Sequence, residues 1–307
     1  MTASIFIDGE AGTTGLQIRD KLAKLPGVAL RSLPAEQRKD QAAKLRAFAE
    51  VDVVILCLPD EAAKETAALI EAMGDRAPRV IDASTAHRVA PGWTYGFPEL
   101  TPGQAQAIAS ARRIANPGCH ATGAVALLRP LTDAGLIPKD MGVTIHSVSG
   151  YSGGGKAMIE AYESGRAPSF ELYALGLEHK HMPEIQLYSG LTARPLFVPS
   201  VGNFRQGMLV SVPLQLDALP GGPSGADLRA ALAEHYRGQR YVRVASAEDS
   251  AKALRLEPES LNGTNDLLIH VYANEPRRQA ALIAKLDNLG KGASGAAAQN
   301  LELMLGL

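Results

Sequence analysis

Residues 4–15, SIFIDGEAGTTG, decide the fold. Residues 4–8 form a short apolar run typical of a buried strand, and a helical pattern covers residues 16–25. Between them, Gly9, Gly12 and Gly15 allow the backbone to turn sharply and to approach a ligand closely. The free N–H groups of the helix start then suit the pyrophosphate of a dinucleotide. This glycine spacing departs from the commonest dinucleotide fingerprint, so an ordinary strand-to-helix turn is the alternative.

The chain on either side of this unit predicts two domains. Three further apolar runs, at residues 28–33, 51–58 and 79–82, alternate with helical stretches and read as buried parallel strands. From about residue 142 longer β-like runs appear, separated by Gly- and Pro-rich loops; they cover residues 143–149, 209–216 and 267–273. We therefore expect an α/β chain with a Rossmann-like dinucleotide-binding domain and an α+β catalytic and dimerisation domain.

The domain boundaries are expected near a cysteine and near the carboxyl terminus. Residues 1–118 and the Ala-rich terminal helix, residues 288–307, are predicted to form the nucleotide domain. Residues 119–287 are predicted to form the second domain. A loop rich in Pro and Gly, residues 220–225, is expected at the surface.

Composition excludes several classes of protein. The 307 residues include 31 Lys+Arg and 32 Asp+Glu, so a net charge of -1 gives no field that attracts nucleic acid or anionic lipid. We find no apolar run of the ~20 residues that span a bilayer and no basic leader with a cleavage site, which predicts a cytoplasmic protein with no membrane partner. Two cysteines in dissimilar contexts argue against a disulfide framework and against a metal site rich in sulfur.

The end of the second predicted strand bears on the choice of cofactor. NAD-specific folds usually place an acidic residue there, against the ribose hydroxyl. Here the sequence is Arg31-Ser32-Leu33, followed by Arg38 and Lys39. The missing acid and the nearby basic residues favour NADP, although Arg38 and Lys39 could equally be a solvated helix start.

Cys119 is the candidate nucleophile. It stands in Asn116-Pro117-Gly118-Cys119, directly before an apolar helical stretch, and a helix start favours the thiolate over the thiol. Cys57 lies within an apolar strand, where burial disfavours a thiolate, so it reads as a structural residue.

A thiolate that attacks a carbonyl needs a group to move protons, and histidine titrates in the useful range. His179 and His181 lie in the polar run Glu178–Glu184. If that run is helical, Glu184 shares a face with His181 and can orient its ring. Acid–base work is preferred over metal binding because no third ligand is evident. The other five histidines read as structural.

Three further features could hold anions. A glycine-rich loop, Ser149–Lys156, follows a predicted strand and ends in a lysine, which suits a phosphate or the nicotinamide end of a cofactor but also a flexible turn. Arg205 and, more weakly, Arg88 could hold an acyl phosphate or a carboxylate, although either could form a surface salt bridge.

These motifs together resemble the shorter form of the N-acetyl-gamma-glutamyl-phosphate reductases, with a more distant likeness to aspartate-semialdehyde dehydrogenases. The likeness covers nearly the whole chain, and the combination of Asn116–Cys119 with His179–Glu184 is the most specific part. Aspartate-semialdehyde dehydrogenases usually lack the Pro-Gly before the cysteine, which makes them the second choice. Two departures are the residues after the cysteine, His120-Ala121 where many relatives carry Tyr-Pro, and the shorter chain.

The resemblance implies reduction of N-acetylglutamyl 5-phosphate by NADPH, in arginine biosynthesis, with release of inorganic phosphate. It implies Cys119 as nucleophile, His181 or His179 as acid–base and Glu184 beside them, in a homodimer or homotetramer. From the motifs and the resemblance together we expect cofactor contacts from Gly9, Gly12, Thr13, Thr14, Gly15, Ser32, Arg38, Ser84, Gly150, Gly153, Asn288, Lys291 and Gly292. We expect substrate contacts from Arg88, Asn116, Ser149, Lys156 and Arg205.

Two alternatives remain open. The same chemistry could act on aspartyl phosphate or on an aminoadipyl phosphate one methylene longer, because one methylene discriminates weakly. A catalytically silent NADP-binding regulator would keep the glycine turn, but it would need neither the helix-start cysteine nor the paired histidines.

Overall fold

The computed structural model describes residues 2–307, so Met1, with which the predicted nucleotide domain begins, lies outside the described residues. The described chain divides into two compact units. The first unit comprises the residues up to Pro98, Pro102–Pro117 and Ala293–Leu307, and the second comprises Glu99–Thr101 and Gly118–Gly292. The division departs from the predicted boundaries in that residues 99–101, 118 and 288–292 all fall in the second unit.

A six-stranded parallel sheet with the order β2-β1-β3-β4-β6-β5 forms the centre of the first unit. Its strands are β1 (Ala3–Asp8), β2 (Val28–Arg31), β3 (Val53–Leu56), β4 (Arg79–Asp82), β5 (Thr94–Tyr95) and β6 (Arg113–Ala115). Ile5 and Ile7 enter one apolar core and Phe6 enters another, because side chains alternate along a strand. The sheet is therefore apolar on both faces, which confirms the predicted Rossmann-like class.

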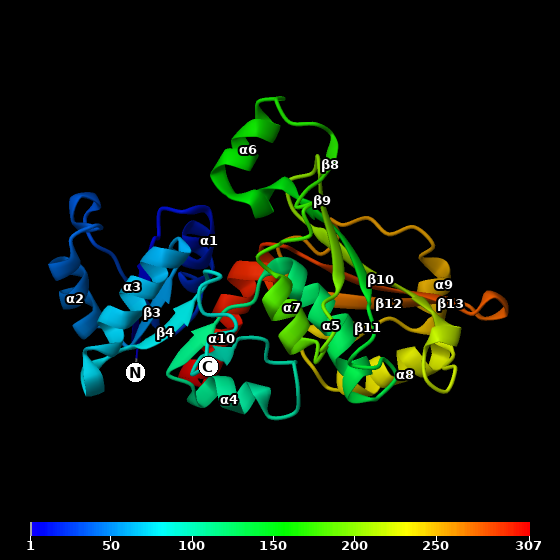
Figure 1. Cartoon of the computed structure of the whole chain (residues 1–307). Helices are drawn as coiled ribbons and strands as arrows, with labels where there is room; N and C mark the ends of the chain where they lie inside the picture. Colours follow the sequence, from blue (N-terminus) through cyan, green and yellow to red (C-terminus); the bar gives the residue numbers. More distant parts are fainter. Residues whose placement is uncertain (1) are drawn as a thin grey trace. The chain divides into compact units, whose positions relative to one another are not determined.

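Helices cover both faces of this sheet. The helices are α1 (Thr13–Leu22), α2 (Gln41–Ala49), α3 (Asp60–Glu71), α4 (Gln104–Ser110) and α10 (Gly295–Leu305). Phe48 of α2 and Ile70 of α3 pack with Phe6, whereas Ile18 of α1 and Leu301 of α10 pack on the opposite face. Figure 1 shows α10, drawn in red, beside α4, so the end of the chain completes the core begun by its first strand.

The second unit is built on a seven-stranded mixed sheet with the order β11-β12-β13-β10-β7-β9-β8. Its strands are β7 (Thr144–Gly150), β8 (Phe170–Leu172), β9 (Leu196–Gly202), β10 (Met208–Gln215), β11 (Val242–Val244), β12 (Leu267–Asn274) and β13 (Gln279–Leu286). The predicted α+β class is confirmed, although β8, β9, β11 and β13 were not among the predicted strands.

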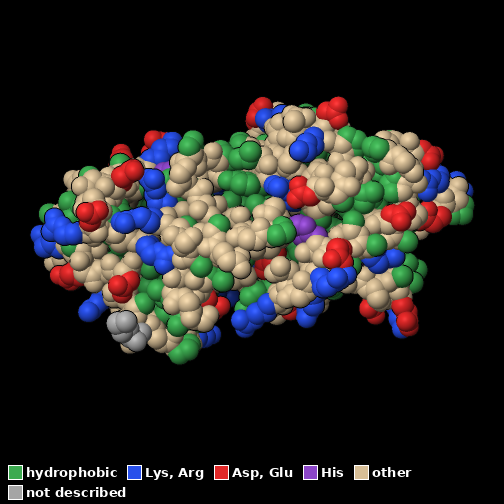
Figure 2. Space-filling model, turned by 90° about the horizontal axis from the view of Figure 1, so that it is seen from below, with side chains coloured by type: hydrophobic (Ala, Val, Ile, Leu, Met, Phe, Trp, Pro, Cys, Tyr) green, Lys and Arg blue, Asp and Glu red, His purple; other side chains and the backbone are tan. Residues whose placement is uncertain are grey.

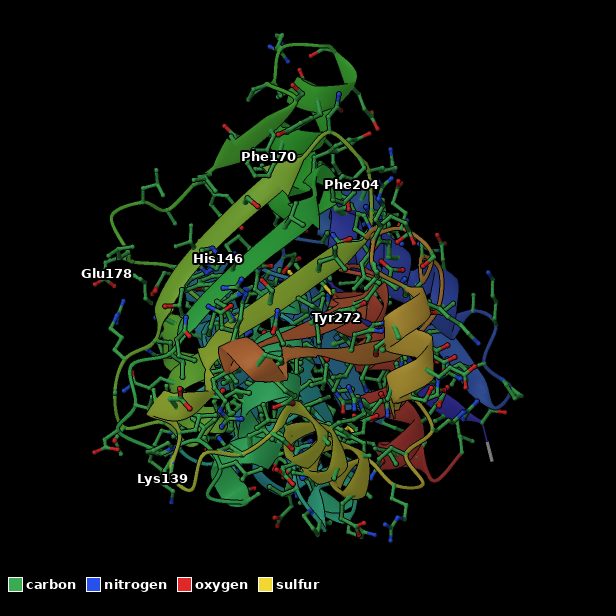
Figure 3. The ribbon with its side chains drawn as sticks, turned by 90° about the vertical axis from the view of Figure 1, so that its right-hand side faces the viewer. Lys139, His146, Phe170, Glu178, Phe204 and Tyr272 are labelled. Atoms are coloured by element: carbon green, nitrogen blue, oxygen red, sulfur yellow. The ribbon has the colours of Figure 1, made fainter. Side chains whose placement is uncertain are left out.

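One face of the second sheet carries the long helix α5 (Cys119–Asp133), which packs against β10 and β13. Gly123 permits this close approach, because a Cβ there would lie 2.6 Å from a methyl carbon of Val210. The other helices are α6 (Gly155–Glu163), α7 (Met182–Tyr188), α8 (Gly225–His235) and α9 (Ala247–Lys252). Figure 3 shows the sheet from the side with His146 of β7, Tyr272 of β12 and, on edge strand β8, Phe170.

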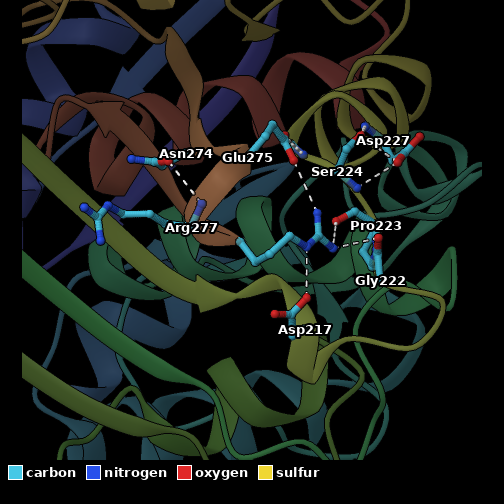
Figure 4. A network of polar contacts seen from close by, with 10 residues as sticks. Asp217, Gly222, Pro223, Ser224, Asp227, Asn274, Glu275 and Arg277 are labelled. Atoms are coloured by element: carbon cyan, nitrogen blue, oxygen red, sulfur yellow. Dashed lines mark hydrogen bonds and ion pairs between the residues drawn. The ribbon is translucent and has the colours of Figure 1, made fainter.

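A polar network fastens the hairpin between β12 and β13 to the loop before α8 (Figure 4). Arg278 has a left-handed backbone (φ 52°) and donates to Asp217 at 2.9 Å and to the carbonyl of Gly222 at 2.8 Å. Residues 220–224 form the loop that the sequence predicted, with residues 220–222 exposed, whereas Pro223 is buried and Gly225 already begins α8.

Acidic and basic side chains are both spread over the face drawn in Figure 2, in keeping with the near-zero net charge. Among residues 2–307, the structure contains no helix with the length and apolar character needed to cross a membrane.

Candidate active site

The site in the second unit begins with Cys119, the first residue of α5. Gly118 precedes the helix with an extended backbone (φ −81°, ψ 150°) and has no side chain to cap the N–H groups of the first turn. These N–H groups and the helix dipole favour negative charge at this end. The cysteine therefore occupies a position that stabilises both a thiolate and an oxyanion formed beside it.

The carboxylate of Glu184 is tied to the same turn. It lies in the first turn of α7, is 1% exposed, and accepts a hydrogen bond from the backbone N–H of Gly118 at 3.1 Å. The sequence predicted that Glu184 orients the ring of His181. The structure gives it a partner that spacing could not reveal, the backbone N–H of Gly118 directly before Cys119.

Both predicted acid–base histidines lie together near the start of α5. The rings of His179 and His181 are 4.7 Å apart and nearly perpendicular, and the backbone N–H of His181 donates to Nδ1 of His179 at 3.1 Å. The ring of His120, the residue after Cys119, lies 5.5 Å from each of them. Both candidates therefore lie beside the residue that follows Cys119, and the geometry does not choose between them.

His120 itself is buried and held at both nitrogens, Nδ1 by the hydroxyl of Ser147 at 2.7 Å and Nε2 by the hydroxyl of Tyr173 at 2.8 Å. Burial, with a smaller contribution from the charge of His179, lowers the pKa of His120 to about 3. The ring is therefore neutral at physiological pH and acts as a hydrogen-bonding support for the residues around it.

Tyr173 is a site residue that the sequence did not reveal. Burial, and secondarily the negative charge of Cys119, raises the pKa of its hydroxyl, so it remains protonated beside the thiolate. The following loop contains two residues with left-handed backbones, Ala174 and Leu177. No local sequence pattern marks Tyr173, because its place beside His120 depends on how this loop folds back from β8.

The glycine turn of the first unit has the tight geometry that its sequence predicted. Gly9 has φ +88°, and a Cβ there would lie 2.3 Å from the carbonyl oxygen of Cys57. A Cβ on Gly15 would lie 2.4 Å from the carbonyl oxygen of Gly9. Side chains are excluded at both positions because the backbone itself packs tightly there, which gives the sharp strand-to-helix turn that the glycines predicted.

Glu10 supplies an acid at the end of β2 that the sequence did not show. Its carboxylate accepts from the hydroxyl of Ser32 at 2.8 Å and pairs with Arg19 at 3.0 Å and with Arg38 at 2.9 Å. Because Arg31-Ser32-Leu33 at the end of β2 contains no acid, the sequence predicted that the acid was missing. A carboxylate reaches that place from the first glycine turn instead.

Comparison with known proteins identifies the family. Residues 9–108 match the family described as "Semialdehyde dehydrogenase, NAD binding domain", and residues 119–288 match "Semialdehyde dehydrogenase, dimerisation domain". N-acetyl-gamma-glutamyl-phosphate reductase from Chelativorans is 54% identical over 99% of both chains. The enzyme of that name from Burkholderia cenocepacia is 53% identical over 99% of this chain and 97% of its own.

The chain belongs to the N-acetyl-gamma-glutamyl-phosphate reductase family. The family prediction made from the cysteine and histidine motifs is confirmed. Aspartate semialdehyde dehydrogenase II from Vibrio cholerae has the same fold, with a TM-score of 0.74 and 16% identity over 99% of both chains.

The carboxyl-terminal motif of this family forms a π-helical turn, Gly290–Ser294. Gly292 packs on the nucleophile, since a Cβ there would lie 2.8 Å from Cβ of Cys119. Asn288 accepts from the N–H of Gly207 at 2.8 Å, and the ammonium of Lys291 is buried against Glu99 at 2.7 Å. The side chains of Asn288 and Lys291 thus bind protein groups, which leaves the backbone of the turn for any contact with a cofactor.

The glycine-rich loop after β7 lies beside the segment that carries Arg205. Gly150 packs so closely that a Cβ would lie 2.6 Å from the backbone nitrogen of Gln206. The hydroxyl of Ser149 donates to the carbonyl of Gly150 at 3.0 Å. Lys156 is exposed on α6, and Arg205 is also exposed and forms an ion pair with Glu163.

The remaining predicted residues belong to the first unit. The hydroxyl of Ser84 donates to the buried carboxylate of Asp82 at 2.8 Å. Nε of Arg88 donates to the carbonyl of Asn116 at 3.1 Å, and the side-chain amide of Asn116 donates to the carbonyl of Ala293 at 3.0 Å. Arg88, a weak candidate by sequence, is 8% exposed, so its charge is buried beside the segment that leads to Cys119.

Proposed function

We propose that this protein uses NADPH to reduce N-acetylglutamyl 5-phosphate to N-acetylglutamate 5-semialdehyde and phosphate, in arginine biosynthesis. The observation that carries the proposal is the position of Cys119 at the open start of α5, with Glu184 and the two histidines beside it. The relatives at 53% and 54% identity are named for this reaction, and the similarity extends over nearly their whole length.

The thiolate of Cys119 attacks the acyl carbon, and the carbon–oxygen bond to phosphate breaks to leave a thioester on the enzyme. The oxyanion formed during the attack lies at the start of α5, where each well-placed N–H donor contributes about 3 kcal/mol. Tyr173, kept protonated by burial, is a further donor near the same thiolate.

NADPH, when bound, would supply the hydride that reduces the thioester to a thiohemiacetal. His181 protonates the thiohemiacetal oxyanion and then removes that proton as the carbon–sulfur bond breaks and the aldehyde leaves. His181 is preferred over His179 because it begins α7, whose first turn also holds Glu184. The proposed substrate contacts remain Arg88, Asn116, Ser149, Lys156 and Arg205.

The first unit fits a dinucleotide because its tight glycine turn leads directly into the start of α1, whose first turn has no side-chain cap. The proposed contacts are the turn with Thr13 and Thr14, then Ser32, Arg38 and Ser84. From the second unit, Gly150, Gly153 and the turn of Asn288–Gly292 are proposed to contact the cofactor. The proposed preference for NADP over NAD rests on Arg19 and Arg38, the two arginines that pair with Glu10 at the end of β2.

We place the enzyme in the cytoplasm as a homodimer or homotetramer. Support for self-association is the second sheet, where a cavity of about 810 Å³ opens between β10, β12 and α9. Leu254, at its edge, is 79% exposed. A Leu254→Glu variant should lower the mass measured by light scattering if this face is the contact.

The test is phosphate-dependent reduction of NADP with N-acetylglutamate semialdehyde, run beside aspartate semialdehyde and with NAD as control cofactor. Turnover with the acetylated substrate and NADP supports the proposal. Turnover with aspartate semialdehyde alone keeps the thioester chemistry and changes the substrate, whereas no turnover with either substrate favours the regulator.

A further inference from the structure

Glu10, Ser32, Arg19 and Arg38 form a cluster, here called the β2 anion cluster, at the carboxyl end of β2 in the first unit. The carboxylate at its centre is buried, with 7% of the side chain exposed, whereas Arg19 is 45% exposed and Arg38 is 41% exposed. One buried anion thus holds two cations whose outer faces are open to solvent.

The position of the cluster matters because dinucleotide-binding folds read the adenosine ribose at the end of this strand. A carboxylate there accepts a hydrogen bond from the 2′-hydroxyl of NAD, and an arginine there binds the 2′-phosphate of NADP. The β2 anion cluster contains both kinds of group.

We propose that Glu10 is a specificity residue that weakens the preference for NADP over NAD. Its carboxylate binds Arg19, Arg38 and Ser32, the groups that would otherwise bind the 2′-phosphate of NADP. The same carboxylate can accept a hydrogen bond from the ribose 2′-hydroxyl of NAD. The inference rests on the proposed dinucleotide-dependent function.

The sign follows from the charges. Both guanidinium groups already pair with Glu10, and the hydroxyl proton of Ser32 is donated to it. A 2′-phosphate bound to the same groups lies close to a carboxylate that is shielded from water, and the repulsion between the two anions costs binding energy. NAD carries no such charge and instead donates its 2′-hydroxyl.

The experiment measures the dissociation constants of NADP and NAD by isothermal titration calorimetry, so the readout does not depend on turnover. Glu10→Gln keeps the shape and the acceptor for Ser32 but removes the charge. It should tighten NADP and weaken NAD, and shift the ratio of the two constants by about tenfold toward NADP.

Glu36→Gln is the matched control, because Glu36 is an exposed acid on the segment between Ser32 and Arg38. It should leave the ratio within about twofold of the native value. Arg38→Gln is a second variant that does not disturb the glycine turn, and it should weaken NADP at least about tenfold while leaving NAD nearly unchanged.

Three results would overturn the inference. The first is a change in the ratio of the two dissociation constants below about threefold in Glu10→Gln. The second is a change of that ratio toward NAD, which would mean that Glu10 positions the arginines for NADP. The third is an equal change of the ratio in Glu36→Gln. If the native chain binds neither dinucleotide, the proposed function and the inference both fail. If it binds both and only the Glu10 result is contrary, the proposed function stands.

Discussion

Cys57 and Cys119 each lie at the end of a secondary-structure element. Cys57 lies at the carboxyl end of a strand, and Cys119 lies at the amino end of a helix. Cys57 follows β3, where its thiol lies near the carboxylates of Asp8 and Asp82; burial and these two charges raise its pKa to about 12. Cys119 begins α5, where the N–H groups of the first turn point toward it.

The difference shows that burial and nearby carboxylates disfavour a thiolate at Cys57, whereas the backbone N–H groups of a helix start favour one at Cys119. Each cysteine also has a glycine packed against it, Gly9 at Cys57 and Gly292 at Cys119. At Cys57 the glycine makes room for the cofactor turn, and at Cys119 it makes room for the nucleophile.

The largest contrast is expected from removing each thiol. Cys119→Ser should lower kcat by roughly a thousandfold or more, because a serine hydroxyl at this position stays protonated and attacks poorly. Cys57→Ala should keep kcat within about twofold. The measurement is steady-state kcat of both variants, after a check that each still binds NADP. Similar losses of kcat in the two variants would contradict the distinction drawn between the cysteines.

Alkylation by iodoacetamide, followed by peptide mass spectrometry, should give the next largest contrast. At pH 8, a thiol with a pKa of about 12 is ionised in about one molecule in ten thousand, so Cys57 should react only after unfolding. Cys119 should react first and be protected by substrate. Equal labelling of the two thiols in the folded protein would contradict this expectation.

Adding a methyl group to each glycine tests the packing. Gly292→Ala places a Cβ 2.8 Å from Cβ of Cys119 and should lower kcat by roughly ten- to a hundredfold with the fold intact. Gly9→Ala, with φ +88° and a contact of 2.3 Å to Cys57, should instead lower the unfolding free energy by about 1–3 kcal/mol and weaken dinucleotide binding. Denaturant melts and binding titrations distinguish the two, and a Gly292→Ala enzyme with native kcat would argue against the contact.

The smallest effect concerns His120, the residue next to Cys119. Its folded pKa of about 3 lies below the ordinary value of 6.5, so the unfolded chain binds a proton that the folded chain does not. The stability it contributes is full above pH 6.5 and is lost as the pH falls toward 3, by about 1.4 kcal/mol per pH unit.

From pH 7 to pH 5, the native protein should therefore lose about 2 kcal/mol more unfolding free energy than His120→Asn, measured by urea denaturation. Parallel curves for the two proteins would mean that folding does not lower the pKa of His120.

Some of the fold could be predicted because local patterns specify it. The alternation of Ile5, Phe6 and Ile7 requires a strand with two apolar faces, and β4 was predicted with the bounds observed. Strands β9 and β13 were missed. β9 contains Pro199, and β13 follows a turn held by long-range contacts of Arg278, so neither has a strong local signal.

The same division holds for the site. Cys119 could be predicted as the nucleophile because a helix start acts on the thiol through adjacent backbone, and His179, His181 and Glu184 could be predicted as its partners because they share one short run. Tyr173 was missed, as was the pairing of Glu10 with Ser32, since each depends on segments that meet only after folding.

The sequence by itself determined the family and the two fold classes, and it predicted the nucleophile and the glycine turn, because each depends on backbone within a few residues. Only the tertiary structure decided what surrounds them. It placed an acid at the end of β2, bound Glu184 to the turn of the nucleophile and buried Lys291 against Glu99. Charges and donors act through distances in space, and those distances are set by packing that no local spacing contains.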